Sequence, residues 1–207
     1  MSIAKVCVLI DGGFLESSFK KSNPGQSFTS DNVLHEVSRT IEAIRAKTAE
    51  DSETIEDVLY RIFYYDCLPF GGTIKKIDGG QKDFSMTQAY RDKLAFLDEL
   101  AKRERVALRI GQLAFTGWAP QIDYSAMQPT ITGYRPLFRQ KGVDMKFGLD
   151  MAWLATRKVV DKIALIAGDS DFITPIKFAR KEGLQVYLNH LGNPIKDDLI
   201  KHCDFII

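Results

Sequence analysis

The strongest constraint on the fold is an apolar run of strand length that stops at a glycine and is followed by two carboxylates. Residues 162–167 read Lys-Ile-Ala-Leu-Ile-Ala, and Gly168, Asp169, Ser170 and Asp171 come directly after them. A run this dense in apolar residues is typical of a strand covered on both faces, as in a parallel sheet. Ligands of such sheets bind outside the carboxyl ends of the strands, which is where Asp169 and Asp171 would lie.

The start of the chain repeats this pattern. An apolar segment, residues 6–10, ends at Asp11, and Gly12 and Gly13 follow. The glycines allow a tight turn and close approach of the backbone to a ligand. Aspartate is also a favoured N-cap of a helix. A capping role and a ligand-binding role therefore both stay open for Asp11.

Strand-like and helix-like segments alternate along the remaining sequence, which predicts a single α/β domain over residues 1–207 with a mainly parallel sheet of five or six strands. Further strands are expected at residues 58–65, 106–110, 184–188 and 205–207. Helical spacing of apolar residues is found at 31–48, 86–104, 145–157, 174–182 and 194–201.

Residues 111–142 do not fit this alternation and are too long for an ordinary connection between a strand and a helix. We expect an insertion there, with a β-hairpin formed by residues 112–115 and 136–139. Residues 69–83 are rich in glycine and lysine and read as a loop. Asp66, just before them, is interpreted as a turn aspartate, with a role as a site ligand left open.

Two further carboxylates lie on the helix expected after the insertion. Asp144 and Asp150 are six residues apart, about 1.7 helical turns, so both point toward the same half of the helix. Asp150 interrupts an otherwise apolar segment. A carboxylate in such a setting needs a partner or a metal ion, because burying it unpaired is costly.

Composition narrows the functional classes. The formal net charge is +1, so nucleic-acid binding would depend on a local basic patch. The sequence has neither G-x-G-x-x-G nor a P-loop, which argues against dinucleotide and NTPase chemistry. Its three histidines do not cluster, which argues against zinc. Three scattered cysteines and the lack of a membrane span or signal peptide favour a cytoplasmic protein.

Several aspartates converging on one sheet edge call for cations. Hard carboxylate oxygens suit Mg²⁺ or Mn²⁺, held together with several water molecules. Such a centre activates a bound water and stabilises both oxygens of an in-line phosphoryl displacement.

Three blocks of the sequence together resemble the NYN domain of the PIN-like nuclease superfamily, and in particular its LabA-like branch. They are Ile10–Phe14, Lys141–Asp144 with Asp150, and Gly168–Phe172, in the order of that family and within roughly residues 3–190. The resemblance implies a Rossmann-like (PIN-like) three-layer sandwich and a metal-dependent endoribonuclease that hydrolyses RNA phosphodiester bonds. It also implies that Asp11, Asp150 and Asp169 bind the metal, and that Asp144 and Asp171 support catalysis.

Four cations in and after the insertion, Lys141, Lys146, Arg135 and Arg139, are candidates to contact RNA phosphates. Trp118, Tyr124 and Tyr134 could stack on the bases of single-stranded RNA. A merely solvated basic face is the alternative interpretation.

A second hypothesis rests on Phe14, which stands where many members of the family carry asparagine. The chain would then be a catalytically weak or inactive NYN module that acts as an RNA- or protein-binding regulator. A homo-oligomer or a regulatory protein partner is compatible with either hypothesis.

Overall fold

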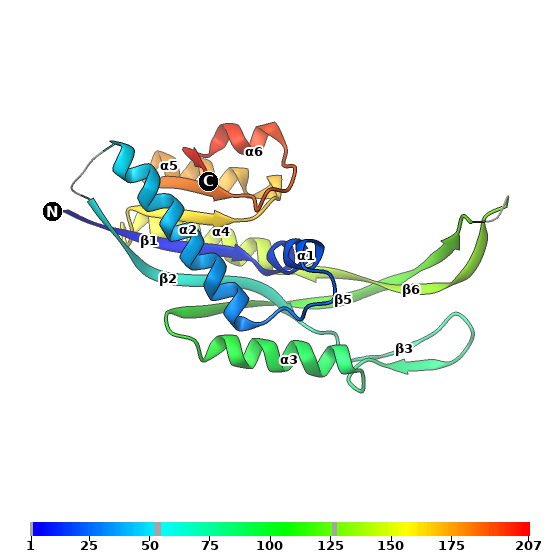
Figure 1. Cartoon of the computed structure of the whole chain (residues 1–207). Helices are drawn as coiled ribbons and strands as arrows, with labels where there is room; N and C mark the ends of the chain where they lie inside the picture. Colours follow the sequence, from blue (N-terminus) through cyan, green and yellow to red (C-terminus); the bar gives the residue numbers. More distant parts are fainter. Residues whose placement is uncertain (1, 52–54, 126–127) are drawn as a thin grey trace.

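The computed structural model describes residues 2–51, 55–125 and 128–207. Its centre is a seven-stranded sheet with the strand order β6-β5-β2-β1-β7-β8-β9 (Figure 1). Only β5 and β6 are antiparallel within this sheet of the described residues. The strands are β1 (Ser2–Asp11), β2 (Ile55–Leu68), β5 (Val106–Asp123), β6 (Thr130–Lys141), β7 (Lys162–Ile166), β8 (Gln185–Asn189) and β9 (Phe205–Ile206).

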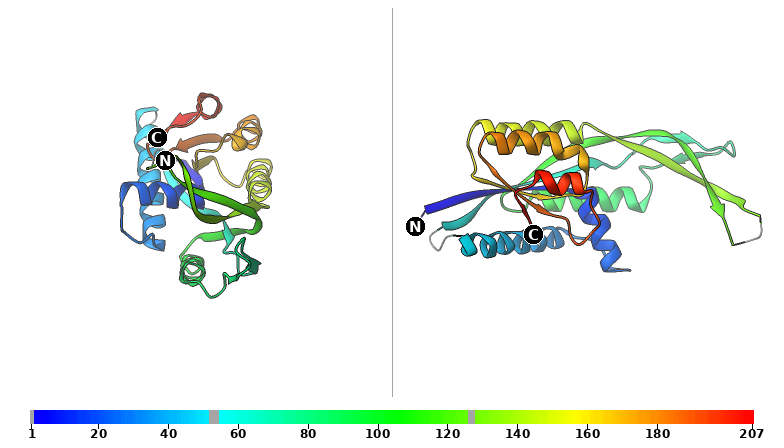
Figure 2. Two further views of the ribbon diagram at one scale, coloured as in Figure 1. Left: turned by 90° about the vertical axis from the view of Figure 1, so that its right-hand side faces the viewer. Right: turned by 90° about the horizontal axis from the view of Figure 1, so that it is seen from above.

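Helices cover both faces of the sheet and complete three layers (Figure 2). One face carries α1 (Gly12–Ser22), α2 (Ser30–Asp51) and α3 (Gln88–Ala101). The other carries α4 (Val143–Thr156), α5 (Ile173–Lys181) and α6 (Asp197–His202), and a short 3₁₀ turn, η1 (Ser170–Phe172), precedes α5. The predicted α/β fold is confirmed, although the sheet has seven strands rather than five or six, because β6 of the predicted hairpin also joins it.

The central strands are apolar on both sides because helices pack on both sides. Val8 and Ile10 of β1 contact the α1–α3 layer, while Cys7 and Leu9 contact the α4–α6 layer. All four side chains are completely buried. This is the environment that produces a continuous apolar run instead of an alternating one.

The predicted hairpin in residues 111–142 is confirmed and is much longer than expected. Residues Gln112–Asp123 of β5 pair with β6 from Gln112↔Lys141 through Phe115↔Phe138 to Asp123↔Thr130. In Figure 1 this two-stranded ribbon extends well beyond the helices. We call these two paired segments the hairpin arm.

A second hairpin supports the base of the hairpin arm. It consists of β3 (Thr73–Lys75) and β4 (Gln81–Asp83) and lies in the stretch that was expected to be a loop. The indole N–H of Trp118 in the arm donates to the carbonyl of Lys75 at 3.2 Å. Five rings with neighbouring centroids 5.2–6.0 Å apart join the two hairpins, namely Phe70, Phe84, Phe115, Trp118 and Phe138.

The interpretation of Asp66 as a turn residue is wrong. Asp66 lies inside β2, where it pairs in register with Ile110 of β5, and only 6% of the residue is exposed. The strand continues because this polar residue finds an ionic partner within the fold.

None of the helices in the described ranges is long and apolar enough to cross a membrane. The three cysteines, Cys7, Cys67 and Cys203, are buried free thiols.

Candidate functional site

Asp11 ends β1 and caps the helix that follows. Its carboxylate accepts a hydrogen bond of 3.0 Å from the backbone N–H of Phe14, in the geometry of an N-cap of α1. Gly12 follows without a side chain because a Cβ there would lie 2.7 Å from the ring of Tyr64. The tight turn thus holds the Asp11 carboxylate at the carboxyl edge of the sheet.

The surroundings of Asp11 disfavour its negative charge. Burial raises the pKa of the Asp11 carboxyl above its ordinary value, and the negative charges of Asp66 and Asp169 raise it further. Hydrogen bonds from the N–H groups of Phe14 and Gly13 oppose the shift without cancelling it. Carboxylates from the ends of β1, β2 and the segment after β7 therefore act on one another at this edge.

Asp169 begins the turn after β7. Its side chain accepts a hydrogen bond of 3.0 Å from the backbone N–H of Asp171 and so caps η1. Both aspartates are exposed. Asp169, and not Asp171, is therefore the residue that caps this turn.

The ring of Phe14 lies directly on Gly168. A Cβ on Gly168 would come within 2.7 Å of that ring, so only glycine fits there without a shift. This contact joins the first turn of α1 to the end of β7. It fixes the position of Asp11 relative to Asp169.

Asp66 belongs to a charge network that the sequence patterns did not reveal. Its Oδ2 lies 2.7 Å from the ammonium of Lys93 on α3, and Lys93 lies 2.8 Å from Glu16 on α1. Burial alone would lower the pKa of Lys93, but Asp66 and Glu16 outweigh it and raise that pKa. Lys93 is thus a fixed cation that balances Asp66, while no cation among the described residues pairs with Asp11.

Asp150 has a partner of its own. Arg109 of β5 donates to its Oδ2 at 2.5 Å, and the hydroxyl of Tyr65 donates to the same oxygen at 3.0 Å. The Arg109 guanidinium also stacks 4.2 Å above the ring of Phe63. The need for a partner that the sequence predicted for Asp150 is met by an arginine, which had not been expected among these aspartates.

The position of Asp150 follows from its neighbours. Its charge adds to the effect of burial in raising the pKa of the Cys7 thiol. Its two hydrogen-bond partners are level with Asp11 in the sheet, because Tyr65 is in register with Asp11 on β1 and with Arg109 on β5. Asp144 is exposed in the first turn of α4, where the helix dipole favours a negative charge.

The four cations predicted to bind RNA fall into two groups. Arg135, Arg139 and Lys141 are exposed on β6. Lys146 lies on α4, and its ammonium donates to the backbone carbonyl of Ile110. Only the first group is presented on the hairpin arm.

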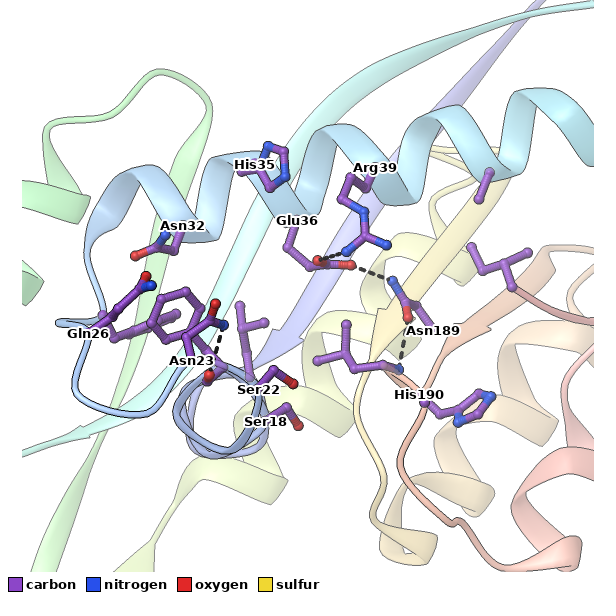
Figure 3. Close-up of a pocket in the computed structure, with 17 residues that line it drawn as sticks. Ser18, Ser22, Asn23, Gln26, Asn32, His35, Glu36, Arg39, Asn189 and His190 are labelled. Atoms are coloured by element: carbon purple, nitrogen blue, oxygen red, sulfur yellow. Dashed lines mark hydrogen bonds and ion pairs between the residues drawn. The ribbon is translucent and has the colours of Figure 1, made fainter.

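A sizeable cavity lies away from these aspartates. A pocket of about 860 Å³ lies between α1, the start of α2 and the end of β8 (Figure 3). Inside it, Glu36 pairs with Arg39 at 3.0 Å and accepts a hydrogen bond of 2.9 Å from Asn189. None of the five predicted aspartates is among its lining residues.

The carboxyl edge offers two carboxylates to a hard cation, those of Asp11 and Asp169. Within the described ranges, no three His, Cys, Asp or Glu side chains are grouped so that they could hold a metal ion by themselves. Mg²⁺, however, commonly uses one or two carboxylates and takes its other ligands from water and substrate phosphates. Asp11 and Asp169 fit that requirement because Asp11 lacks a cationic partner in this part of the chain.

Comparison with curated proteins finds no match to the chain. A family model described as the NYN domain matches residues 77–207. The matched range includes Asp144, Asp150, Asp169 and Asp171, whereas Asp11 and Asp66 precede it. Because the match covers more than half of the 207 residues, the chain belongs to the NYN domain family of PIN-like nucleases.

Proposed function

We propose that the chain is a divalent-metal-dependent ribonuclease that hydrolyses RNA phosphodiester bonds at the carboxyl edge of its sheet. The observation that carries the proposal is the state of Asp11. Asp11 is half-buried, the pKa of its carboxyl is raised, and the negative charges of Asp66 and Asp169 contribute to that rise. A cation bound at this point would relieve all three effects.

In this proposal Asp11 and Asp169 hold one Mg²⁺ or Mn²⁺. When bound, the ion would lower the pKa of a water molecule and neutralise charge on the scissile phosphate. Asp11 is held in place by its hydrogen bond from Phe14, and Asp169 by its bond from Asp171. The edge is therefore organised before substrate arrives, which is the condition for effective charge stabilisation.

The other predicted site residues take supporting places in the proposal. The side chain of Asp171 is exposed next to Asp169 and is available to orient water. Asp144 is exposed at the start of α4. Asp150, predicted as a third metal ligand, has one oxygen engaged by Arg109 and Tyr65. Only its other oxygen would be available to an ion.

Two finer assignments belong to the same proposal. We place the chain in the LabA-like branch on the motifs around Asp11, Asp144 and Asp169. We place it in the cytoplasm because its three cysteines are free thiols.

The test is cleavage of labelled RNA by the purified chain with Mn²⁺ or Mg²⁺. We expect Asp11→Asn and Asp169→Asn each to lower the rate by about 100-fold or more, the usual effect of removing one preorganised group that stabilises charge. Asp197→Asn changes an exposed aspartate in the first turn of α6 and is the matched control. Cleavage that is absent from the wild type, or unchanged in Asp169→Asn, would contradict the proposal.

The pairing of Asp150 with Arg109 favours a second candidate function, because it removes one expected ligand from the site. The chain would then be a catalytically weak or inactive NYN module that binds RNA or a protein as a regulator. Under this alternative the wild type binds RNA without turnover, and Asp11→Asn binds equally well.

A further inference from the structure

One face of β6 carries a row of cations. Side chains alternate between the two faces of a strand, so Arg135, Arg139 and Lys141 lie on the same face. All three are exposed, whereas Pro136 and Phe138 on the opposite face are partly buried. We call these three residues the cationic stripe.

The face of β6 that carries the cationic stripe is open to solvent. The opposite face packs against the second hairpin, where Phe138 contacts Phe70 and Phe84 with centroids 5.2 and 5.5 Å apart. On β5, Arg135 and Arg139 have alanines as cross-strand partners, Ala119 and Ala114. These small side chains leave both guanidinium groups uncovered.

Within the described residues, none of the cations of the stripe has an ion pair or hydrogen bond through its side chain. Arg103 shows the contrasting case on the body of the protein, where it pairs with Asp31 and Glu99. Three unpaired cations in a row on a fixed ribbon offer a complementary surface to a polyanion.

The stripe ends near the aspartate edge. Lys141 is the last residue of β6, and the side chain of its neighbour Gln140, on the opposite face of the strand, lies near the turn after β1. A Cβ placed on Gly13 would lie 3.5 Å from Asp11 Oδ1 and 3.8 Å from the amide nitrogen of Gln140. From Lys141 the stripe runs outward to Arg135, a distance of about 20 Å at ~3.4 Å per residue.

The shape of this surface favours a single nucleic-acid strand over a duplex. The stripe is a single row, and β6 is the edge strand of the sheet. Tyr124 and Tyr134, near the far end of the arm, are 73% and 44% exposed, so they are available for stacking by unpaired bases. Trp118 is not, because its ring packs on Phe115 and its N–H is bonded to Lys75.

We propose that the cationic stripe holds the backbone of single-stranded RNA along β6 and directs the strand to the aspartate edge. This inference rests on the proposed function, since it treats the same edge as the place of cleavage. Phosphates lie on the stripe face of β6, and bases near the end of the arm stack on Tyr134 across the free edge.

The experiment measures binding of a labelled single-stranded RNA at several salt concentrations in EDTA, so that no metal or turnover is required. Each phosphate contact contributes about 0.7 to the slope of log K against log salt for a single strand. The variant Arg135→Ala/Arg139→Ala/Lys141→Ala should therefore lose about 2 from that slope and bind more weakly at low salt.

Two further variants control for net charge and for guanidinium geometry. Lys177→Ala/Lys181→Ala/Lys201→Ala removes the same charge from exposed positions on and near α5 and α6 and should keep the wild-type slope. Arg135→Lys/Arg139→Lys keeps the charge and should also keep the slope.

An unchanged slope in the first variant would overturn the inference, as would an equal loss in the control. Duplex RNA that binds as tightly as the single strand would overturn the single-strand assignment. Stripe-dependent binding without any cleavage by the wild type would refute the proposed function and leave this inference standing. Cleavage that ignores the stripe would do the reverse.

Discussion

The surroundings of aspartate differ between the two ends of the parallel sheet. At the amino end, the side chain of Asp57 is completely buried and lies 2.7 Å from the ammonium of Lys162, which also donates to Thr48 at 2.7 Å. At the carboxyl end, Asp11 is surrounded by further negative charge and has a raised pKa. The Asp57–Lys162 pair neutralises its own charge, whereas the unpaired carboxylate of Asp11 leaves room for an added cation.

The largest effect that tests this contrast is expected from removing the cation at the amino end. Lys162→Met leaves Asp57 buried without a counter-charge. We expect the free energy of unfolding to fall by about 3–5 kcal/mol, the usual cost of breaking a buried pair. Unfolding in guanidinium chloride, followed by circular dichroism, measures the change.

The double variant Lys162→Met/Asp57→Asn serves as its control. Without a charge left behind, most of the lost stability should return. Asp169→Asn at the other end should change the free energy of unfolding far less, because Asp169 is exposed and pairs with no cation among the described residues. A loss as large as that of Lys162→Met would remove the contrast between the two ends.

Asp150 is paired but partly exposed, so removing its partner should lower the free energy of unfolding by an intermediate amount. Arg109→Met keeps an unbranched stem on Phe63 but leaves Asp150 with only the hydroxyl of Tyr65. The side chains of Asp150 and Arg109 are 19% and 30% exposed, so solvent reduces the penalty to about 1–3 kcal/mol. The same denaturant titration tests this, and Arg109→Met/Asp150→Asn should recover most of the loss.

The smallest expected effect has the opposite sign. The pKa of Asp11 is raised in the folded state, so folding disfavours its ionised form. That unfavourable contribution is absent below the ordinary pKa of aspartate, grows as the pH rises from there to the raised pKa, and is complete above it. Asparagine keeps the N-cap without the charge. Asp11→Asn should therefore be slightly more stable than the wild type near neutral pH.

Thermal melts across the pH range check this prediction. The gain in Tm should shrink to nothing in acid, where Asp11 is protonated. Adding Mn²⁺ at neutral pH should stabilise the wild type more than the variant, since a ligand that binds the folded state more tightly stabilises it more at the same concentration. A variant that melts below the wild type at neutral pH would contradict the account of Asp11.

The central strands of the fold could be predicted because the apolar runs that mark them are local in the sequence. The strands ending at Asp11 and before Gly168 are buried on both faces, and no other local structure explains such runs so well. The hairpin arm was predictable in kind, through the length of residues 111–142. Its extent was not, because the polar sequence near its far end resembles a loop as much as an exposed ribbon.

The charge partners could not be predicted, because they depend on tertiary pairing. Arg109 is 41 residues from Asp150 in the chain, and its place on β5 does not mark it as an ionic partner. Lys93 lies on a helical face that reads as solvated, yet it pairs with Asp66. The aspartates of the edge were visible from the sequence, but which of them are already neutralised was not.

The continuity of β5 has a consequence for how the arm can change in length. The strand runs for 18 residues without a break, from the core of the sheet into the hairpin arm. Side chains alternate with a period of two, so an insertion of two residues in each strand of the arm keeps Arg135 and Arg139 on their present face. A single added residue reverses every face beyond it unless a bulge absorbs it, as at Thr116, where the register with β6 shifts by one residue. Between such bulges, the reach of the arm is adjustable in steps of a residue pair.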